Sequence, residues 1–327
     1  MRAIILSAGL GERLRPFTSV RAKPAIEFLN MPMLAFPYFW LDSLGLKEVT
    51  FNTHHLPETI RHAAMHVADP EVQLHFPHEE AILGSGGGIW NARFQLQGDR
   101  NFAIANGDGV IVCENRDALS ELRERHEAED ALATILVCPL EGVGTRIPGV
   151  WMNQEGKVSG FGKTSPRPGL ECLHYASFMI LSERIWDRLP QGSSNIIYDV
   201  LEPAIREGET VIGHRVDDMR WFETGNVTDY LIATQSCLQY LKEQNAFGQN
   251  LRQMIARFAR NSELVLRGQD LGLVDSSAQL DPSSQARGFF VIGGKCRVEA
   301  FAQIENSVLL PVSQLLGGQV VQNQVLI

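Results

Sequence analysis

Short apolar runs alternate with segments of helical length through the first 140 residues of the chain. The predicted strands cover residues 2–7, 49–52, 72–76, 102–106 and 131–137, and the predicted helices cover residues 33–44, 57–67 and 117–128. Strands that alternate with helices form a mostly parallel sheet covered on both faces, which is an α/β fold. Ligands of such sheets bind beyond the carboxyl ends of the strands.

The middle of the chain mixes hairpin and helical patterns. It predicts a hairpin over residues 149–161, strands over 175–181 and 210–216, and helices over 198–206 and 226–242. We therefore expect one large domain over residues 1–245. The remainder, residues 246–327, is expected to hold a helix and then a different kind of fold.

The C-terminal tail has an apolar period of six residues. The repeating positions are Ile292, Val298, Ile304, Leu310 and Leu316, and the segment 304–310 also resembles the segment 321–327, seventeen residues later. This period suits stacked coils with one inward side chain on each short face, as in a β-helix. An accidental pattern in a β-rich tail is the alternative. Because the ends of a short solenoid are open, self-association into a homo-oligomer is a hypothesis for this region.

Composition narrows the class of protein. A net charge of −9 and a pI near 5.5 argue against a nucleic-acid-binding surface. We find neither an apolar run long enough to span a membrane nor a basic-then-apolar leader. No two of the five cysteines lie within three residues of each other, which favours buried free thiols in a reducing compartment over a metal knuckle. A cytoplasmic protein is expected.

A glycine turn with cations follows the first predicted strand. Gly9 and Gly11 let backbone N–H groups point at an anion, and Arg13, Arg15 and Lys23 supply positive charge. Such a turn suits a group that carries several negative charges. A purely structural turn with solvated arginines is the alternative.

Two other phosphate motifs fit this turn poorly. The dinucleotide fingerprint would need its third glycine where Leu14 stands, and Pro16 interrupts the helix that should follow. Glu27 does lie at a suitable distance for a ribose contact, so this alternative stays open. No Gly-Lys-Ser/Thr follows, so the Walker A pattern is absent.

Residues 8–18 read Ala-Gly-Leu-Gly-Glu-Arg-Leu-Arg-Pro-Phe-Thr, and Lys23-Pro24 follows. The chain thereby resembles the sugar-1-phosphate nucleotidylyltransferases, also called NDP-sugar pyrophosphorylases, over about residues 1–240. The resemblance implies a Rossmann-like nucleotidyltransferase domain with a mixed, mostly parallel sheet. It also implies a short left-handed β-helix in the tail. Within the family the chain is similar to bacterial branches that act on hexose, heptose or N-acetylmuramate phosphates.

The resemblance implies a set of nucleotide-binding residues, which are Ala8, Gly9, Gly11, Gly86, Gly87 and Asn106. Of these, Gly86 and Gly87 belong to a loop over residues 83–88 that would receive the base. A flexible turn before a helix at Ile89 is the alternative. Backbone readout leaves little trace in side chains, so the base stays open.

The resemblance also implies Mg²⁺, held by Asp108 and Glu223. Glu223 stands where the family has an aspartate, and a solvated loop carboxylate is its alternative. On the sugar side, Lys163 matches the lysine that contacts the sugar-linked phosphate, and Gly149 matches a glycine near the sugar. Gly162 replaces the usual sugar-binding glutamate, so sugar recognition is expected to differ.

Other polar residues receive structural interpretations. Asp199 matches a recurrent family aspartate, and capping or orienting a helix is the favoured interpretation. His54 and His55 are adjacent in a strand-like segment and would face opposite ways, so a shared metal ion is not expected. His126 lies on a charged helix and is expected to have no role in a site.

The reaction that the resemblance implies is Mg²⁺-dependent transfer of a nucleoside monophosphate from an NTP to a sugar 1-phosphate. Arg13 would neutralise the leaving pyrophosphate, Lys23 would bind the NTP phosphates and Lys163 the incoming phosphate. The sugar phosphate is already an anion, so no general base is needed. A non-catalytic regulatory homologue and transfer to a non-sugar phosphate are the alternatives.

Overall fold

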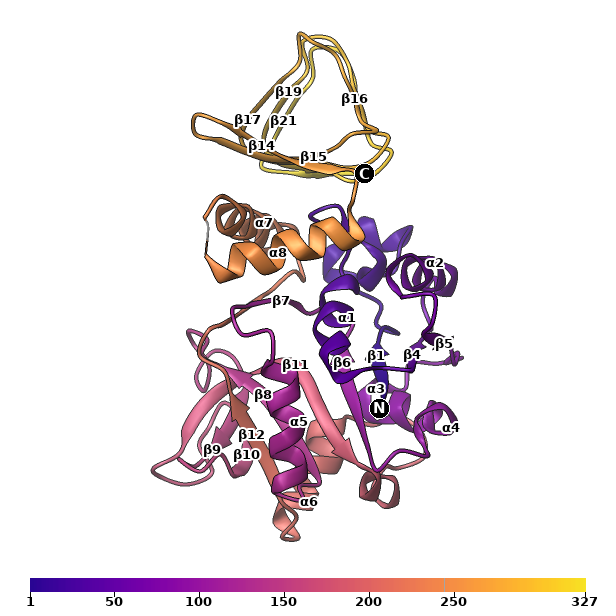
Figure 1. The fold of residues 1–327 in the computed structure, drawn as a ribbon, viewed down its shortest axis with the longest axis vertical. Coiled ribbons are helices and arrows are strands. Elements are labelled where there is room, and N and C mark those ends of the chain that lie inside the picture. The colour runs from indigo at the N-terminus through magenta and orange to yellow at the C-terminus, as the bar shows by residue number, and fades with distance from the viewer. Residues whose placement is uncertain (244) are drawn as a thin grey trace. The chain divides into compact units, whose positions relative to one another are not determined.

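The structure is a computed structural model that describes residues 1–243 and 245–327. The chain folds into two compact units (Figure 1). Unit 1 comprises Met1–Leu10 and Phe36–Trp221, and unit 2 comprises Gly11–Ala35 and Phe222–Ile327. These units are not the predicted domains 1–245 and 246–327, and that division stays a prediction.

Unit 1 is built on a nine-stranded mixed sheet, as expected for an α/β fold. The main strand order is β10-β9-β11-β6-β1-β4-β5, with β8 beside β11 and β12 beside β8. The strands are β1 Arg2–Leu6, β4 Glu48–Asn52, β5 Gln73–His75, β6 Asn101–Asn106, β8 Ala133–Cys138, β9 Gly149–Met152, β10 Val158–Gly162, β11 Glu171–Ser182 and β12 Val211–Arg215. The run β6-β1-β4-β5 is parallel, β12 is parallel to β8, and β11 is antiparallel to both β6 and β8.

Unit 1 also contains helices, several of which contact this sheet. They are α1 Ala35–Leu41, α2 Pro57–Val67, α3 Gly84–Asn91, α4 Arg93–Leu96, α5 Ala118–Ala128 and α6 Glu202–Arg206, and a π-helix over Ile196–Leu201 precedes α6. Figure 1 shows α5 alongside β8, β11 and β12, which it contacts, while α3 and α4 contact β1. A short strand β7, Val110–Cys113, pairs with β13, Met219–Phe222.

The core of the sheet explains why its strands read as continuous apolar runs. Ala3, Ile4 and Ile5 of β1 have no exposed surface, and Ile104 of β6 beside them is equally buried. A strand buried on both faces has no polar side to alternate with. The predicted strands 2–7 and 102–106 and the predicted helix 57–67 are confirmed within a residue at each end.

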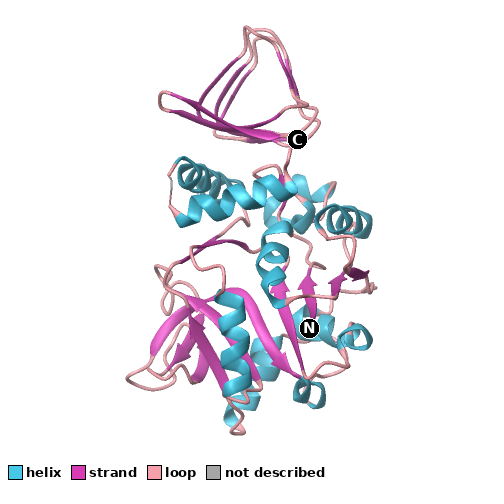
Figure 2. Cartoon of the chain, viewed as in Figure 1, coloured by secondary structure: helices cyan, strands magenta, loops and turns pink. Residues whose placement is uncertain are grey.

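Unit 2 begins with a short hairpin and ends in stacked strands. The hairpin pairs β2, Glu27–Phe28, with β3, Met31–Pro32, and the helices are α7, Val227–Lys242, and α8, Ala246–Phe258. The later strands are β14 Ser262–Arg267, β15 Asp270–Asp275, β16 Gln279–Leu280, β17 Gln285–Ile292, β18 Arg297–Val298, β19 Gln303–Leu309, β20 Gln314–Leu315, β21 Val320–Gln322 and β22 Val325–Leu326. They form two ladders, β14-β15-β17-β19-β21 and β16-β18-β20, in which every pair after β14–β15 is parallel. Figure 2 shows the strands joined by turns.

The pairing register confirms the seventeen-residue repeat. Ile304 lies opposite Val321, and Leu309 lies opposite Leu326. The preceding coil is one residue longer, because Ala286 lies opposite Ile304.

The six-residue period is wrong at its last position. Leu316 is 47% exposed, whereas Leu315 is buried and lies opposite Val298. The coil that contains them is the shorter one, so the inward position arrives one residue early. Ile292, Ile304 and Leu310 are buried as predicted.

The cysteines are free thiols, and four of the five are buried. Burial raises the pKa of the Cys113 thiol to about 12 and that of the Cys172 thiol to about 11. In the described part of the chain, no helix has the length and apolarity that crossing a bilayer requires.

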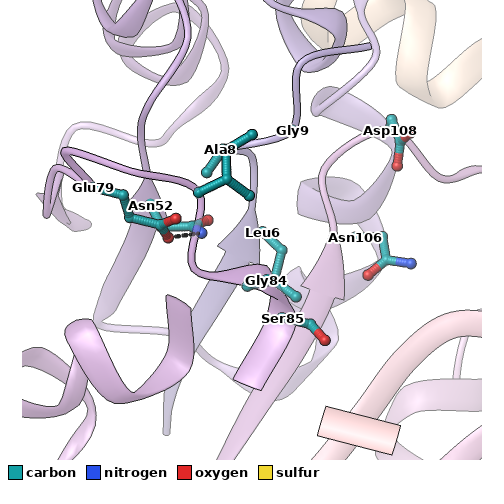
Figure 3. Close-up of a pocket in the computed structure, with 10 residues that line it drawn as sticks. Leu6, Ala8, Gly9, Asn52, Glu79, Gly84, Ser85, Asn106 and Asp108 are labelled. Carbon is teal, nitrogen blue, oxygen red and sulfur yellow. Dashed lines mark hydrogen bonds between the residues drawn. The ribbon is translucent and has the colours of Figure 1, made fainter. Parts of the chain in front are cut away.

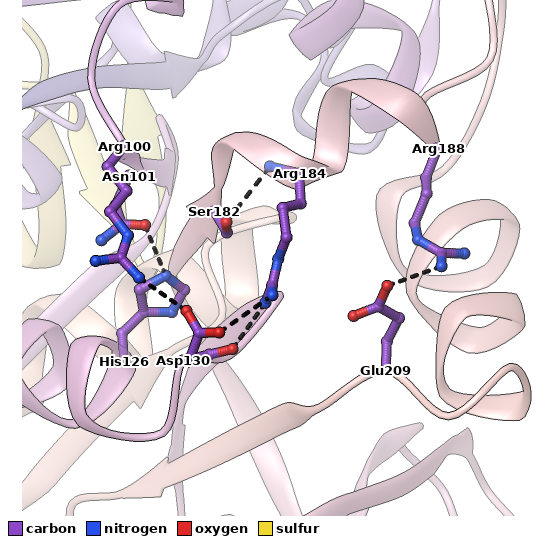
Figure 4. A network of polar contacts seen from close by, with 8 residues as sticks. All are labelled: Arg100, Asn101, His126, Asp130, Ser182, Arg184, Arg188 and Glu209. Atoms are coloured by element: carbon purple, nitrogen blue, oxygen red, sulfur yellow. Dashed lines mark hydrogen bonds and ion pairs between the residues drawn. The ribbon is translucent and has the colours of Figure 1, made fainter.

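His126 lies on α5 as predicted, and the structure shows that it is buried there. The residue is only 1% exposed, and its ring lies at hydrogen-bond distance from Thr134 Oγ1 (3.0 Å) and Asn101 Oδ1 (3.2 Å). Figure 4 shows the contact with Asn101. Around it, Arg100 and Arg184 both form ion pairs with Asp130. The histidine therefore ties α5 to the first residue of β6. Burial lowers its pKa to about 4.

Candidate active site

A cavity of about 240 Å³ opens at the carboxyl ends of three neighbouring parallel strands (Figure 3). The last residues of β1, β4 and β6 line it, which are Leu6, Asn52 and Asn106. The remaining lining residues come from the loops beyond these strands and from the start of α3: Ala8, Gly9, Glu79, Ile82, Gly84, Ser85 and Asp108. The site thus lies where parallel α/β sheets bind ligands.

Four of the predicted site residues meet in this cavity: Ala8, Gly9, Asn106 and Asp108. Backbone hydrogen bonds hold the turn that carries Asp108. Gly107 N–H donates to Leu6 O at 2.8 Å, and Gly109 N–H donates to Asn106 O at 3.3 Å. The end of β1 therefore positions the carboxylate that follows β6.

The two glycines of the first loop have different surroundings. A Cβ built on Gly9 would meet no atom within 4 Å, so protein packing does not require a glycine there. Gly11 has a φ of 62°, and a Cβ on it would lie 2.8 Å from Thr18 Cγ2 and 3.0 Å from Lys23 Cβ. Gly11 and Lys23 are thus neighbours within unit 2, and Gly11 is required by its backbone and by packing.

The predicted loop over residues 83–88 is wrong in its conformation. These glycines form the first turns of α3, which starts at Gly84 rather than at Ile89. A Cβ on Gly86 would lie 2.5 Å from Ser194 Oγ, and a Cβ on Gly87 would clash with the Gly192 carbonyl oxygen. Close packing of α3 on residues 192–196 accounts for both glycines, and base binding by them stays a prediction.

A buried polar network on the cavity wall was missed by the sequence analysis. Asn52 Oδ1 accepts from Ser7 N–H at 2.7 Å, and Asn52 Nδ2 donates to Glu79 Oε1 at 2.6 Å. Glu79 Oε2 accepts from Leu83 N–H at 3.0 Å, just before α3. The position of Asn52 at the end of a predicted strand was a usable signal. Nothing in the sequence marks Glu79, because glutamate is rarely fully buried.

Arg13 and Glu223 form an ion pair within unit 2, with 3.9 Å between Arg13 Nη2 and Glu223 Oε1. The same Oε1 accepts from Thr224 N–H at 3.1 Å and from Gly225 N–H at 2.7 Å. A Cβ on Gly225 would lie 2.5 Å from this oxygen and 2.7 Å from Arg13 Nη2, so the glycine permits the approach. Glu223 is therefore not merely a solvated loop carboxylate.

The remaining predicted residues lie outside the described lining of the cavity. Lys23 is 8% exposed and starts a 3₁₀ turn in unit 2. Lys163 is exposed directly after the edge strand β10, and Gly149 begins β9, which lies between β10 and β11. A Cβ on Gly149 would lie 2.5 Å from Cys172 Sγ, so packing explains this glycine. Asp199 Oδ2 accepts from Asn195 N–H at 2.7 Å, as the favoured interpretation predicted.

Comparison with known families bears on the cavity directly, because the model of the family described as Nucleotidyl transferase matches residues 2–146. Residues 2–146 form a nucleotidyl transferase domain. This region includes β1, β4 and β6 and every residue that lines the cavity.

Curated relatives agree with this assignment. A mannose-1-phosphate guanyltransferase of Schizosaccharomyces pombe is 28% identical over 74% of this chain, and the match spans 66% of that protein, just under two thirds of its length. A mannose-1-phosphate guanylyltransferase of Mycobacterium tuberculosis is 25% identical over 93% of this chain and 82% of its own length. A UTP–glucose-1-phosphate uridylyltransferase of Synechocystis is 26% identical over 96% of this chain and 84% of its own length. The predicted resemblance to sugar-1-phosphate nucleotidylyltransferases is confirmed.

A solved structure shares the fold. The crystal structure of HddC from Yersinia pseudotuberculosis complexed with GMP-PN has a TM-score of 0.57 and 20% sequence identity, and covers 72% of this chain and 98% of that chain. A second crystal structure of HddC from Yersinia pseudotuberculosis has a TM-score of 0.58 and 20% sequence identity.

Proposed function

We propose that this chain transfers a nucleoside monophosphate from an NTP to a sugar 1-phosphate. One observation carries the proposal: Gly9 and Asp108 line one cavity at the carboxyl ends of adjacent parallel strands. The open space at Gly9 suits the approach of a phosphate to backbone N–H groups, and Asp108 suits a metal ion bound to that phosphate. The names of the curated relatives support the same reaction class.

In the proposed reaction an oxygen of the sugar phosphate forms a bond to the α-phosphorus of the NTP. The bond from the α-phosphorus to the oxygen that bridges it to the β-phosphorus breaks, and pyrophosphate leaves with that electron pair. The nucleophile is an anion at neutral pH, so the protein aligns two anions and neutralises charge rather than removing a proton. Arg13, Lys23 and Lys163 are the cations that we propose for this task, and Gly149 stays a prediction for the sugar.

Mg²⁺ is the proposed cofactor, since it combines carboxylate and phosphate oxygens with water. Asp108 fits this role, because its turn fixes a carboxylate at the cavity wall. Glu223 stays the second ligand that the resemblance predicts, and its Oε1 is held by two backbone N–H groups. When bound, the ion would neutralise charge on the reacting phosphates.

For the tail we propose a short left-handed β-helix after α8. The parallel registers at 18 and 17 residues support stacked coils. A homo-oligomer through this region and a cytoplasmic location are further proposals, and neither nucleic acid nor a membrane is proposed as a partner. Measuring the oligomeric state of the full chain by light scattering tests the first of these.

The experiment that tests the function is a matrix of GTP, UTP, dTTP, ATP and CTP against a panel of sugar 1-phosphates. Pyrophosphate release and the mass of the nucleotide-sugar product are measured with the purified full chain. We expect equal amounts of both products for at least one pair. Pyrophosphate release that does not depend on the sugar phosphate would contradict the proposal, as would no release with any pair.

A further inference from the structure

A second cavity, of about 310 Å³, lies within unit 2 between the helices α7 and α8 and the first two strands of the tail. The two helices contact each other, as Figure 1 shows. Small-molecule sites have this size and are lined mostly by apolar side chains. The apolar side chains here that are buried or half-buried are Leu241, Ile255, Ala259, Leu264 and Leu273.

The strand side of this cavity is the outer face of the first coil. Leu264 of β14 lies opposite Leu273 of β15, and the next pair along the strands is Val265 with Gly272. A Cβ on Gly272 would meet the Phe290 ring, so this second pair faces the core of the tail. Because side chains alternate along a strand, the two leucines face outward, toward the helices. Space that the helices leave unfilled beside them lacks contacts that an occupant would restore.

Two exposed arginines, Arg252 and Arg260, also line the cavity. Arg252 Nη2 donates to the Leu241 carbonyl oxygen, and Arg260 Nε donates to the Arg257 carbonyl oxygen at 3.2 Å. A guanidinium has five N–H donors, so most of the donors on each side chain remain for a ligand. In the part of the chain that the structure describes, no carboxylate forms an ion pair with either arginine, and no acidic residue lines the cavity.

We infer that this cavity binds an organic carboxylate with an apolar chain. The chain occupies the space beside the outward leucines, and the carboxylate accepts N–H groups from Arg252 and Arg260. The planar fork of an arginine matches the two oxygens of a carboxylate. An inorganic anion would leave the apolar space unfilled, and a neutral molecule would leave the arginines without an anion. The inference is independent of the proposed reaction, because the lining lies within residues 241–273.

A purely structural role for the arginines makes a different prediction. Arg252 and Arg260 donate to carbonyl oxygens near the ends of α7 and α8, which is a common way to cap a helix. If capping were their whole role, substituting them would change the free energy of unfolding, but the protein would not distinguish a carboxylate from an alcohol of the same chain length. Discrimination between two such ligands therefore reports on binding.

The experiment is calorimetric titration of the full chain with butanoate, hexanoate, octanoate and octanol. We expect octanoate to bind with a Kd of about 1 mM or tighter. Affinity should rise about threefold for each CH₂ group added between butanoate and octanoate. Octanol should bind at least about tenfold more weakly than octanoate. Absence of octanoate binding, an affinity that does not depend on chain length, or equal binding of octanoate and octanol overturns the inference with the wild-type protein alone.

A first pair of variants tests whether the chain occupies this cavity. Ala256 lines it on the exposed side of α8, so Ala256→Leu takes part of the space and should weaken octanoate binding at least about tenfold. Gln253→Leu is the matched control, because Gln253 is exposed on the same helix and outside the described lining, and it should leave the affinity unchanged. Unchanged octanoate affinity in folded Ala256→Leu would place the ligand elsewhere and overturn the inference.

A second pair tests the charge. Arg260→Gln should weaken octanoate binding at least about tenfold and leave octanol binding unchanged. Arg257→Gln removes the same charge from a neighbouring position outside the described lining, so it should change octanoate affinity much less. Equal losses in the two variants would show that only the general field of the protein attracts the anion, which contradicts a carboxylate held at Arg260.

Discussion

The two ends of strand β6 carry polar networks of similar composition that differ in what they face. At the first residue, Asn101 contacts the buried His126, and all the partners there are protein groups (Figure 4). At the last residue, Asn106 lines the cavity with Asp108, and the Glu79–Asn52 pair lies on the cavity wall (Figure 3). The ends are five residues apart, which is roughly 17 Å in a strand.

The comparison separates polar groups that hold the fold from those that serve a ligand. His126 has a protein partner for each ring nitrogen, so its network is complete without a ligand. The carboxylate of Glu79 retains capacity to accept, and Gly9 adjoins open space. The networks at the two ends of β6 both contain buried polar residues. Access to the cavity is what distinguishes one network from the other.

The largest effect is expected at the cavity end of β6. Asp108→Asn keeps the size of the side chain but removes the charge proposed for the metal, so turnover should fall at least about 100-fold. The free energy of unfolding should change by less than about 1 kcal/mol. Initial rates of pyrophosphate release and denaturant titration check the two parts. A variant with wild-type turnover would remove Asp108 from the reaction.

His126→Ala tests the network at the first residue of β6, where every partner is a protein group. It removes both ring contacts, so the buried Thr134 hydroxyl and the half-buried Asn101 amide oxygen lose this partner, and the free energy of unfolding should fall by about 3 kcal/mol. The folded fraction should keep the wild-type kcat/KM. A large loss of kcat/KM with unchanged stability would show that the His126 network takes part in the active site.

Low pH should reduce the stability that the buried His126 contributes to the fold. The folded-state pKa of His126 is lowered to about 4 from an ordinary value of 6.5, chiefly by burial, so between these values the unfolded chain binds more protons. Stability is therefore present above pH 6.5 and falls as the pH drops toward 4, by about 2 kcal/mol between pH 7 and pH 5. Burial lowers the pKa of His174 to about 4 as well, so it adds to the loss.

Urea titrations at several pH values measure this dependence. His126→Gln is the control, because glutamine donates and accepts but does not titrate, and its stability should depend less on pH over this range. An equal pH dependence in the two proteins would exclude His126 as a source.

The smallest effect is expected at Gly9. A Cβ there meets no protein atom, so Gly9→Ala should leave stability unchanged or raise it by up to about 1 kcal/mol. The added methyl group takes space beside the cavity, so we expect NTP affinity to fall about tenfold, or about 1.4 kcal/mol. Calorimetric titration with the preferred NTP measures it.

Gly87→Ala is the matched comparison for Gly9→Ala. Its Cβ would clash with the Gly192 carbonyl oxygen, so this variant should lose about 1–3 kcal/mol of stability. Equal stability losses in the two variants would contradict the distinction drawn between these glycines.

Much of this fold was predictable because its strands are buried on both faces. Continuous apolar runs predicted β1, β4 and β6, and the seventeen-residue repeat predicted which residues pair in the tail. The position of Asp108 after a strand predicted its place at the carboxyl edge of the sheet.

The predictions that failed concern residues whose environment is set by contacts that the sequence does not display. The sequence indicates a ligand-binding loop at Gly86 and Gly87, but close packing against residues 192–194 explains why both positions are glycine. Leu316 fits the six-residue period, but Leu315 pairs with Val298 and takes the buried position instead. The burial of Glu79 and His126 was equally invisible, because their hydrogen-bond partners, Asn52 and Thr134, are paired with them only by the fold.

The most direct test is a crystal structure of the full chain with a non-hydrolysable NTP and Mg²⁺. The account predicts the phosphates beside Gly9 and the metal on Asp108. A nucleotide bound elsewhere, with the cavity at the carboxyl ends of β1, β4 and β6 filled only by water, would contradict it.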